Sequence, residues 1–280
     1  MSALALGLLA ALCWGFHDLA VRYVSQTVSV IAALMAVLVA GALLQFGLVA
    51  IWAGFAPMSA KAVSYAVVAG GFYLLAGLSM YAAFQRGPVR LVAPLVASYP
   101  VLSVTLAIWR GSEVSIWHWL AIIAIGAGVS IVSTRSDDST EYPAAGPTIA
   151  FSILAAVGFA ATFALGQYAA ELGDEFIVSL IGRLTAIPVL AVIAIASRKS
   201  LWPGTRALPL LCLMGALDAV AILCVVSAGG LPNAQYASVA ASIFGLLTVV
   251  LAWAILREEM AFFQWLGCII AFAGIGYLAI

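Results

Sequence analysis

The heptapeptide LAALCWG at residues 9–15 returns as LAAVGFA at residues 154–160. A second stretch, VAPLVAS at residues 92–98, aligns in the same way with YASVAAS at residues 236–242. A third match is a glutamate followed by a tryptophan at the same separation, as Glu113 with Trp119 and as Glu259 with Trp265. The offset stays between roughly 144 and 146 residues in all three places, which is about half of the chain. The sequence therefore indicates that one unit has been duplicated.

The composition indicates that lipid is the solvent for most of this chain. Of the 280 residues, 66% are hydrophobic and 8% are charged, and the formal net charge is zero. A soluble domain of this length cannot hide so much apolar surface. The neutral balance gives no indication of a nucleic-acid partner. All four cysteines lie in apolar runs without CxxC spacing, which predicts core residues and neither disulfides nor a metal site: Cys13, Cys212, Cys224 and Cys268.

Ten apolar segments are long enough to cross a bilayer core, which takes about 20 residues of helix. They are residues 3–23, 28–53, 62–84, 90–110, 115–134, 147–170, 175–196, 207–228, 233–256 and 261–280. No basic stretch precedes the first segment, so we expect a retained helix and not a cleaved signal. The polar connector 135–146 divides a first five-span repeat (1–134) from a second (147–280). Because five is an odd number, the second repeat must enter the membrane from the opposite side. The predicted fold is therefore an all-α polytopic membrane protein with ten transmembrane helices in a 5+5 inverted repeat.

Several features of this pattern are similar to a known family. They are the Trp14-Gly15 pair in the first span, a fourth span that contains prolines, and Glu113 and Glu259 where the fourth span of each repeat meets the fifth. On these features the whole chain resembles the EamA family of the drug/metabolite transporter superfamily. The resemblance implies a carrier of small metabolites, and one branch of the family exports aromatic amino acids. The second repeat departs from the pattern at Phe159-Ala160, which indicates that the two halves have specialised.

The distribution of basic residues bears on orientation, because lysine and arginine mark cytoplasmic loops. Most of them fall in or beside odd-numbered loops, whereas Lys61 and Arg110 fall in even ones. This count places both termini outside the cytoplasm, while the family resemblance implies termini inside. Reporter fusions at Ile280 distinguish the two orientations. In either case we expect a multi-pass protein of a bacterial inner membrane.

Charged residues inside the spans are candidates for function, because a charge at bilayer depth is costly and usually faces a cavity or a partner. Arg183 in the seventh span and Asp218 in the eighth lie at depths that differ by only about 3 Å on the helical rise. A direct or near pair between them is therefore feasible. Such a pair either binds a charged group of a substrate or is a permanent structural ion pair, and the sequence leaves both interpretations open.

The dipeptide His17-Asp18 lies in the last third of the first span. Asp18 and Arg22 have the spacing of a same-face helix pair, which predicts a structural ion pair near the membrane edge. His17 faces elsewhere on the helix. It either donates to a helix carbonyl or contacts a substrate.

Aromatic and hydroxyl side chains add to the predicted site. Trp14 and Tyr99 lie well inside their spans, and a buried tyrosine hydroxyl needs a hydrogen-bond partner. Prolines on both sides of Tyr99 free backbone carbonyls, so polar groups gather in the fourth span. Tyr81 and Tyr73 in the third span are weaker candidates, and helix packing is the alternative for each. The predicted substrate-binding residues are Tyr99, His17, Trp14, Ser98, Tyr81, Asp218, Arg183 and Ser242.

Glycines and prolines predict where helices bend and where they pack. Sharp kinks arise at prolines and at pairs of small residues, so the predicted hinge residues are Pro94, Pro100, Pro188, Gly70 and Gly71. Gly126 and Gly128 in the fifth span and the aligned Gly274 in the tenth predict that these two spans pack closely. Glu113 and Glu259 follow turns at helix starts, where we expect them to cap helices.

Other classes of function fit the sequence less well. An intramembrane metalloenzyme needs more than the two histidines present, and GxSG and GxGD protease motifs are absent, so an enzyme is not expected. A channel needs a continuous polar pore, whereas the polar residues here are scattered. No nucleotide-binding motif appears, and no cofactor or metal is expected.

The sequence therefore predicts a secondary carrier that works by alternating access around a cavity formed by spans one, three, four, six, eight and nine. The expected substrates are small, partly apolar metabolites, with export of neutral or aromatic amino acids first. A sugar, a nucleobase or a drug-like molecule is the alternative. The expected partners are this substrate and the lipid bilayer, and a monomer suffices.

Overall fold

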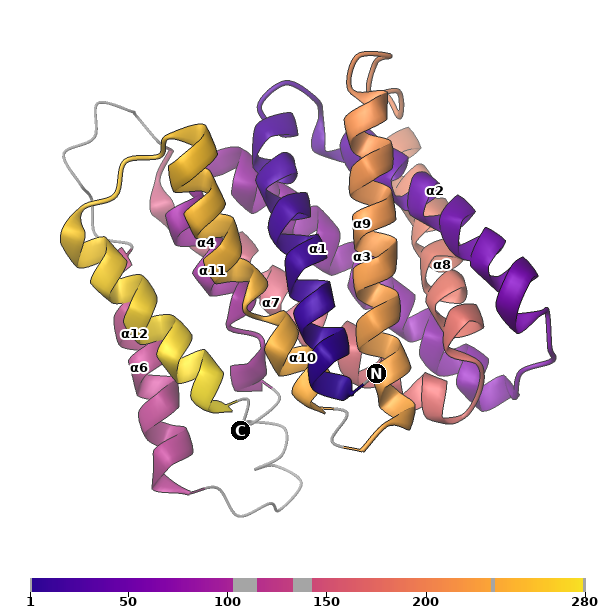
Figure 1. The fold of residues 1–280 in the computed structure, drawn as a ribbon. Coiled ribbons are helices and arrows are strands. Elements are labelled where there is room, and N and C mark those ends of the chain that lie inside the picture. Colours follow the sequence, from indigo (N-terminus) through magenta and orange to yellow (C-terminus); the bar gives the residue numbers. More distant parts are fainter. Residues whose placement is uncertain (1, 103–114, 133–142, 233–234, 279–280) are drawn as a thin grey trace.

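The computed structural model describes residues 2–102, 115–132, 143–232 and 235–278, and all regular elements in these ranges are helices (Figure 1). Glu113, Arg110 and most of the connector 135–146 lie outside them. The first repeat contains α1 (Ala3–Val24), α2 (Val30–Leu48) with the π-helical turn η1 (Val49–Ala53), α3 (Ala60–Arg86), α4 (Val89–Ala97) and α6 (Ile116–Val132). The second contains α7 (Ala145–Glu171), α8 (Glu175–Ala196), α9 (Leu208–Ser227) with the 3-10 turn η2 (Ala228–Gly230), α10 (Gln235–Ala241), α11 (Phe244–Leu251) with the π-helical turn η3 (Ala252–Leu256), and α12 (Phe262–Leu278).

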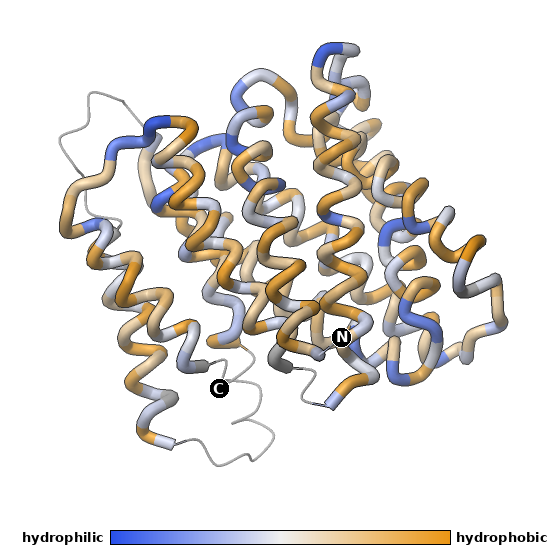
Figure 2. Tube along the Cα trace, in the orientation of Figure 1, coloured by the Kyte–Doolittle hydropathy of each residue, from blue (hydrophilic) through white to orange (hydrophobic). Residues whose placement is uncertain are grey.

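Seven helical segments in the described ranges are long and apolar enough to cross a membrane. They correspond to predicted spans one to three and six to nine. Spans four, five and ten correspond to shorter apolar helices: Val89–Leu102, Trp119–Gly128 and Phe262–Tyr277. Figure 2 shows apolar residues along the helices and polar residues mainly toward their ends. The chain is thus a multi-pass integral membrane protein, and seven segments within the described ranges reach full spanning length.

Polar caps fix where several helices begin. The hydroxyl oxygens of Ser2, Ser29 and Ser59 accept hydrogen bonds from backbone N–H groups in the first turns of α1, α2 and α3. Asp174 accepts from two N–H groups at the start of α8. Each cap satisfies donors that the helix itself leaves unpaired. Short polar residues between long apolar runs therefore set the ends of the spans.

The packing of the helices repeats when the two halves are exchanged. Helix α1 packs against α9 as α7 packs against α3, and α2 packs against α9 as α8 packs against α3. Helix α6 packs mainly against α12, at one side of the bundle (Figure 1). The start of α1 and the end of α12 lie at the same end of the bundle (Figure 1).

The fourth segment of each repeat is broken at the aligned position. Helix α4 ends at Ala97 and helical backbone resumes at Pro100, whereas α10 ends at Ala241 and α11 begins at Phe244. A serine closes each break by donating its hydroxyl to the carbonyl oxygen three residues earlier. These are the 2.7 Å bond from Ser98 to Leu95 and the 2.6 Å bond from Ser242 to Val239.

The predicted packing of the fifth and tenth spans is confirmed, with one exception. A Cβ atom on Gly128 would lie 2.5 Å from the Gly267 carbonyl oxygen, and one on Gly274 would lie 2.7 Å from that of Ala121. These two glycines therefore let the backbones of α6 and α12 touch. The prediction was wrong for Gly126, because a Cβ atom there would have no atom of another helix within 4 Å in the described ranges.

Candidate functional site

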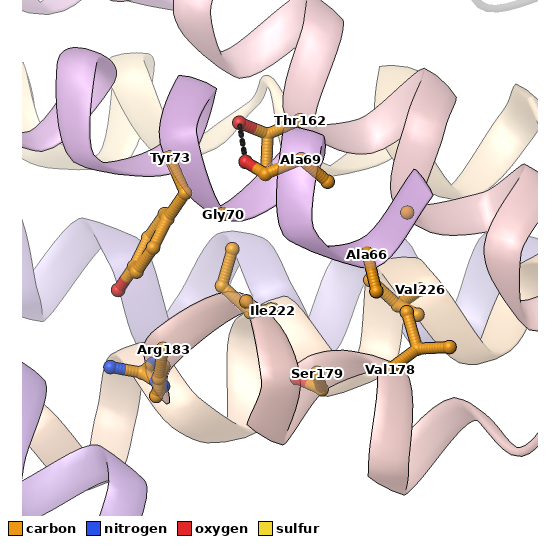
Figure 3. A pocket seen from close by; sticks show the side chains of 12 residues that line it. Ala66, Ala69, Gly70, Tyr73, Thr162, Val178, Ser179, Arg183, Ile222 and Val226 are labelled. Carbon is orange, nitrogen blue, oxygen red and sulfur yellow. Dashed lines mark hydrogen bonds between the residues drawn. The ribbon is translucent and has the colours of Figure 1, made fainter. Parts of the chain in front are cut away.

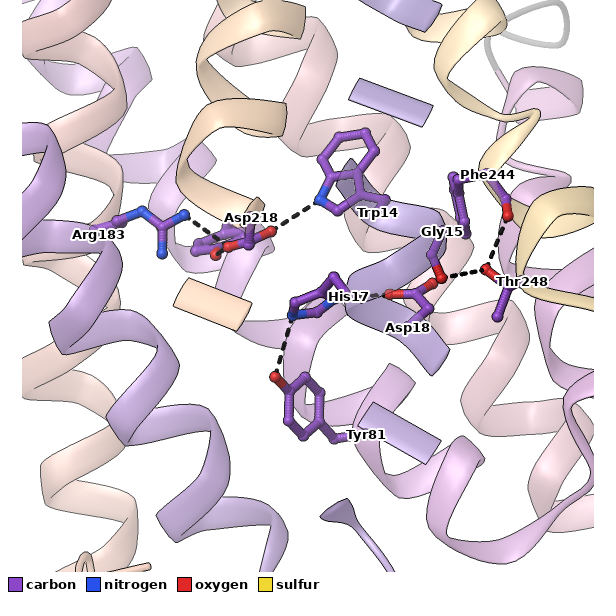
Figure 4. A network of polar contacts seen from close by, with 10 residues as sticks. Trp14, Gly15, His17, Asp18, Tyr81, Arg183, Asp218, Phe244 and Thr248 are labelled. Atoms are coloured by element: carbon purple, nitrogen blue, oxygen red, sulfur yellow. Dashed lines mark hydrogen bonds and ion pairs between the residues drawn. The ribbon is translucent and has the colours of Figure 1, made fainter. Parts of the chain in front are cut away.

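The Asp218 carboxylate on α9 is the centre of a buried polar network (Figure 4). It accepts a 2.9 Å hydrogen bond from the indole N–H of Trp14 on α1 and a short one from the Tyr73 hydroxyl on α3. The Arg183 guanidinium on α8 lies 2.6 Å from the same carboxylate, so the predicted ion pair is present. Because Trp14 and Tyr73 belong to the first repeat and Arg183 to the second, this carboxylate connects the two halves.

Arg183 is held at 1% exposure by its neighbours. Its guanidinium lies over the Tyr73 ring, with 5.3 Å between the guanidinium carbon and the ring centroid. Space for it depends on Gly41 of α2, where a Cβ atom would lie 2.5 Å from Nη1. Burial of an ion pair is costly unless its remaining donors are hydrogen-bonded. Within the described ranges, Arg183 Nε and Nη1 have no hydrogen-bond partner.

A second polar group is formed by His17, Asp18 and Tyr81. His17 Nδ1 lies 2.8 Å from Asp18 Oδ1, and His17 Nε2 lies 3.3 Å from the Tyr81 hydroxyl. The predicted pair between Asp18 and Arg22 was wrong, because Arg22 turns toward the end of the bundle and contacts Glu258. His17 bonds to a side chain, not to the helix carbonyl that was one of its two expected partners.

A narrow central pocket, with a cavity volume of about 10 Å³ in this conformation, lies between these two groups. Its lining residues are Trp14, Asp18, Met80, Phe159, Phe163, Asp218 and Phe244. They come from α1, α3, α7, α9 and α11, which are five of the six segments predicted to form a central cavity. The fourth span contributes none of these residues.

The pocket walls are mainly aromatic rings packed around Trp14. The Trp14 ring centroid lies 5.4 Å from that of Phe163, 5.9 Å from Phe244 and 6.2 Å from Phe159. Such separations are typical of favourable aromatic pairs. Gly15, the partner of Trp14 in the repeated motif, has a different role, because a Cβ atom there would meet the Leu247 side chain at 2.5 Å.

A second pocket lies between α3, α7, α8 and α9, beside the ion pair (Figure 3). Tyr73, Ser179 and Arg183 supply polar groups, and most of the remaining wall consists of small or branched apolar residues. Thr162 lines it as well, but its hydroxyl donates to the Gly158 carbonyl at 2.8 Å. The Arg183 and Asp218 pair thus lies between two pockets.

The other predicted site residues lie outside both pockets. The Tyr99 hydroxyl donates to the Ser238 carbonyl oxygen, and its ring packs against Phe163 at 5.1 Å. Ser98 and Ser242 use their hydroxyls within their own broken helices. These three side chains already have intramolecular partners, so in this conformation they support the walls of the site.

The predicted hinge residues occupy different settings. Pro94 and Pro188 lie inside α4 and α8, and both helices continue through them. Pro100 begins the helical stretch after the break in the fourth span. Gly70 touches α8, since a Cβ atom there would lie 2.4 Å from the Gly182 carbonyl oxygen, whereas Gly71 has open space.

An ion pair at the end of α1 was missed by the sequence analysis. Arg22 Nε lies 3.3 Å from Glu258 Oε1, and Arg22 also donates to the Phe84 carbonyl at 2.8 Å. Glu258 Oε2 accepts from the Val89 N–H at the start of α4. No such bond to the Glu259 side chain occurs among the described residues, so the predicted cap at the start of the tenth span is not seen there, and Glu258 caps a different helix, α4. Burial raises the pKa of the Glu258 carboxyl above its ordinary value, although Arg22 and the Val89 N–H act in the opposite direction.

The pocket aromatics Phe163 and Phe244 were also missed. Phe159 and Phe163 are four residues apart, the spacing of neighbours on one helix face, and this was the available indication. In an apolar span the same spacing occurs on every face. The sequence alone therefore did not distinguish the pocket face from the lipid face.

Comparisons with known proteins agree with this architecture. The family model for the EamA-like transporter family matches residues 1–134 and 146–280. No match was found among the curated proteins. One crystal structure of a protein superposes with a TM-score of 0.72 over 98% of this chain and 95% of the other, at 15% sequence identity, which supports the fold alone. Since the family model covers both repeats, the chain belongs to the EamA-like transporter family.

Proposed function

We propose that the protein is a secondary carrier that exports neutral amino acids, aromatic ones first, across a bacterial inner membrane. The observation that carries this proposal is the central pocket, which has aromatic walls and two carboxylates at its border. Ligand sites in proteins combine mostly apolar walls with a few fixed polar groups in this manner. The lining suits a small molecule with one apolar part and one charged part, and the pocket must widen to admit it.

The pocket chemistry favours an amino acid over a sugar. Rings of Trp14 and Phe163 offer faces on which an aromatic side chain can stack. Asp18 and Asp218 offer negative charge for the ammonium group, while Arg183 is already paired with Asp218 and lies outside the lining of this pocket. A sugar would instead need a wall of neutral hydrogen-bonding groups, and the lining supplies few.

Contacts between the repeats at both ends of α1 support alternating access. Near its start, a Cβ atom on Gly7 would lie 2.4 Å from the Ala237 carbonyl oxygen, so α1 and α10 touch there. Near its end, Arg22 contacts Glu258 of the second repeat. Opening one contact while keeping the other would expose the central pocket to one side at a time. The predicted hinges at Pro94, Pro100, Pro188, Gly70 and Gly71 would absorb this movement.

The driving force is the substrate gradient, with a proton-coupled version as the second candidate. His17 and Asp218 are the groups that would carry a proton, since both are buried beside the pocket.

Export from loaded proteoliposomes tests the proposal. Vesicles are loaded with labelled phenylalanine, threonine or a sugar, with and without a pH gradient, and protein-free vesicles serve as the control. We expect saturable export of phenylalanine, weaker export of threonine and none of the sugar. Movement of the sugar while both amino acids stay inside would end the amino-acid proposal. Indifference to the pH gradient would remove the proton-coupled version, and ohmic currents would indicate a channel.

A further inference from the structure

The Asp18 carboxylate differs from Asp218 in how its charge is balanced. Asp218 has Arg183 as a basic partner and accepts two further hydrogen bonds. Asp18 is 1% exposed, and its Oδ2 has no hydrogen-bond partner within the described ranges. Its other oxygen contacts only His17.

In its neutral form, His17 leaves the negative charge of the Asp18 carboxylate unbalanced. A neutral imidazole with its proton on Nδ1 satisfies both contacts, because it donates to Asp18 and accepts from the Tyr81 hydroxyl. In this arrangement no lysine or arginine of the described residues forms an ion pair with Asp18. A buried carboxylate without a positive partner is costly, so this position favours a cation.

The aromatic walls favour the same sign of charge. Phe163 and Phe244 lie with their ring centroids 5.4 Å and 5.9 Å from that of Trp14, on the pocket that Asp18 also lines. The faces of aromatic rings attract cations within about 6 Å of the centroid. The same faces and Asp18 would repel a carboxylate placed between them.

We infer that the central pocket is a binding subsite for a protonated amine, in which Asp18 Oδ2 accepts from the ammonium group and the rings of Trp14 and Phe163 face it. The ligand class is a small primary ammonium compound with an apolar body. The inference rests on the proposed function only in taking this pocket as the substrate site. It deepens that proposal, because the amine is the recognised group and a carboxylate on the substrate is dispensable.

Four ligands of one shape separate the possible recognition groups. They are 2-phenylethylamine, phenylalanine, 2-phenylethanol and 3-phenylpropionate, and their binding to the purified full chain in lipid nanodiscs is measured by calorimetry at neutral pH. We expect 2-phenylethylamine to bind as tightly as phenylalanine, and the alcohol and the acid to bind about tenfold more weakly or worse. Equal affinity for 3-phenylpropionate and 2-phenylethylamine would overturn the inference.

A matched pair of variants tests the named acceptor. Asp18→Asn should weaken binding of 2-phenylethylamine about tenfold or more and leave that of 2-phenylethanol unchanged, because only the charged ligand loses its partner. Asp174→Asn is the control, since Asp174 caps α8 away from the pocket and asparagine caps equally well. An unchanged affinity for the amine in Asp18→Asn would refute the assignment. If that variant does not fold, the ligand series on the unaltered protein still decides.

The outcomes separate this inference from the proposed function. Binding of 2-phenylethylamine without export of any amino acid would support the subsite and end the exporter proposal. Export of phenylalanine that is inhibited equally by the amine and the acid would support the carrier and end the subsite.

Discussion

At the scale of single residues, the buried carboxylates of this protein differ in how their charge is compensated. Asp218 is balanced by Arg183, and Glu258 is partly balanced by Arg22. Among the described residues, His17 is the single ion-pair partner of Asp18. The sequence predicted the first of these pairs because both residues belong to adjacent antiparallel spans and their depths can be counted. It did not predict the second, because Arg22 and Glu258 lie 236 positions apart and nothing local connects them.

Removing the charge of Asp218 should destabilise the protein strongly. Asp218→Asn leaves the Arg183 guanidinium buried without a counter-charge, which we expect to lower the free energy of unfolding by about 3–5 kcal/mol. Replacing both partners by apolar residues, as in Arg183→Met with Asp218→Leu, should recover much of this loss. Thermal unfolding in detergent measures both variants against Glu171→Gln, a change at an exposed position. A single variant as stable as this control would contradict the prediction.

The buried Glu258 should make stability depend on pH. Burial raises the pKa of the Glu258 carboxyl in the folded protein, so the folded protein binds a proton at this carboxyl more tightly than the unfolded chain does. The resulting stability is fully present below the ordinary glutamate pKa and is lost as the pH rises through the raised value. Glu258→Gln should therefore flatten the fall in melting temperature over that range, whereas Glu259→Gln at the exposed neighbour should not. Identical pH profiles for all three proteins would rule this out.

At the scale of elements, small residues determine which helices touch. Gly70 and Gly71 are adjacent in α3, yet only Gly70 meets another backbone. The sequence predicted both as hinge residues, because it shows the pair and not the direction in which each one points. A helix places neighbouring residues about 100° apart, so one of the two faces α8 while the other faces away.

Substitutions at this pair distinguish a contact from a hinge. Gly70→Ala would force a carbon against the Gly182 carbonyl, and we expect a loss of about 1–3 kcal/mol from overpacking. Gly71→Ala should be neutral or stabilising by up to about 1 kcal/mol, because alanine favours helix. Unfolding measurements and export rates are taken on both. Equal slowing of export by the two variants, with unchanged stability, would favour the hinge.

The break in the fourth span should matter for movement more than for folding. The second repeat makes the same break with Phe244 where the first has Pro100, so proline is not required to form it. Pro100→Ala should therefore leave the protein folded, but it permits the helix to extend through the break and should slow export. Rates are compared in both directions with those of Pro203→Ala, in a loop. Unchanged rates would remove Pro100 from the mechanism.

At the scale of the whole molecule, the duplication is what made the fold predictable. Hydropathy and the repeat placed ten segments in order, and each one corresponds to a helix at least in part. The break in the fourth span could not be foreseen, because segment length was judged from hydropathy, which continues through Ser98. The pocket lining depends on contacts such as those between Trp14 and Phe163, and a single sequence does not encode which faces meet.

The position of Asp218 between the repeats has a consequence for the kinetics of the proposed alternating-access cycle. Its bonds to Trp14 and Tyr73 cross from one repeat to the other, so reorientation must break them. A bound ligand can take over part of this bonding, whereas the empty protein has nothing to replace it and faces a higher activation barrier. The return of the empty carrier should then limit the cycle, and one-for-one exchange should run faster than net efflux. Unlabelled phenylalanine outside loaded vesicles should accordingly accelerate release of the labelled compound, and equal rates with and without it would show that the barrier lies elsewhere.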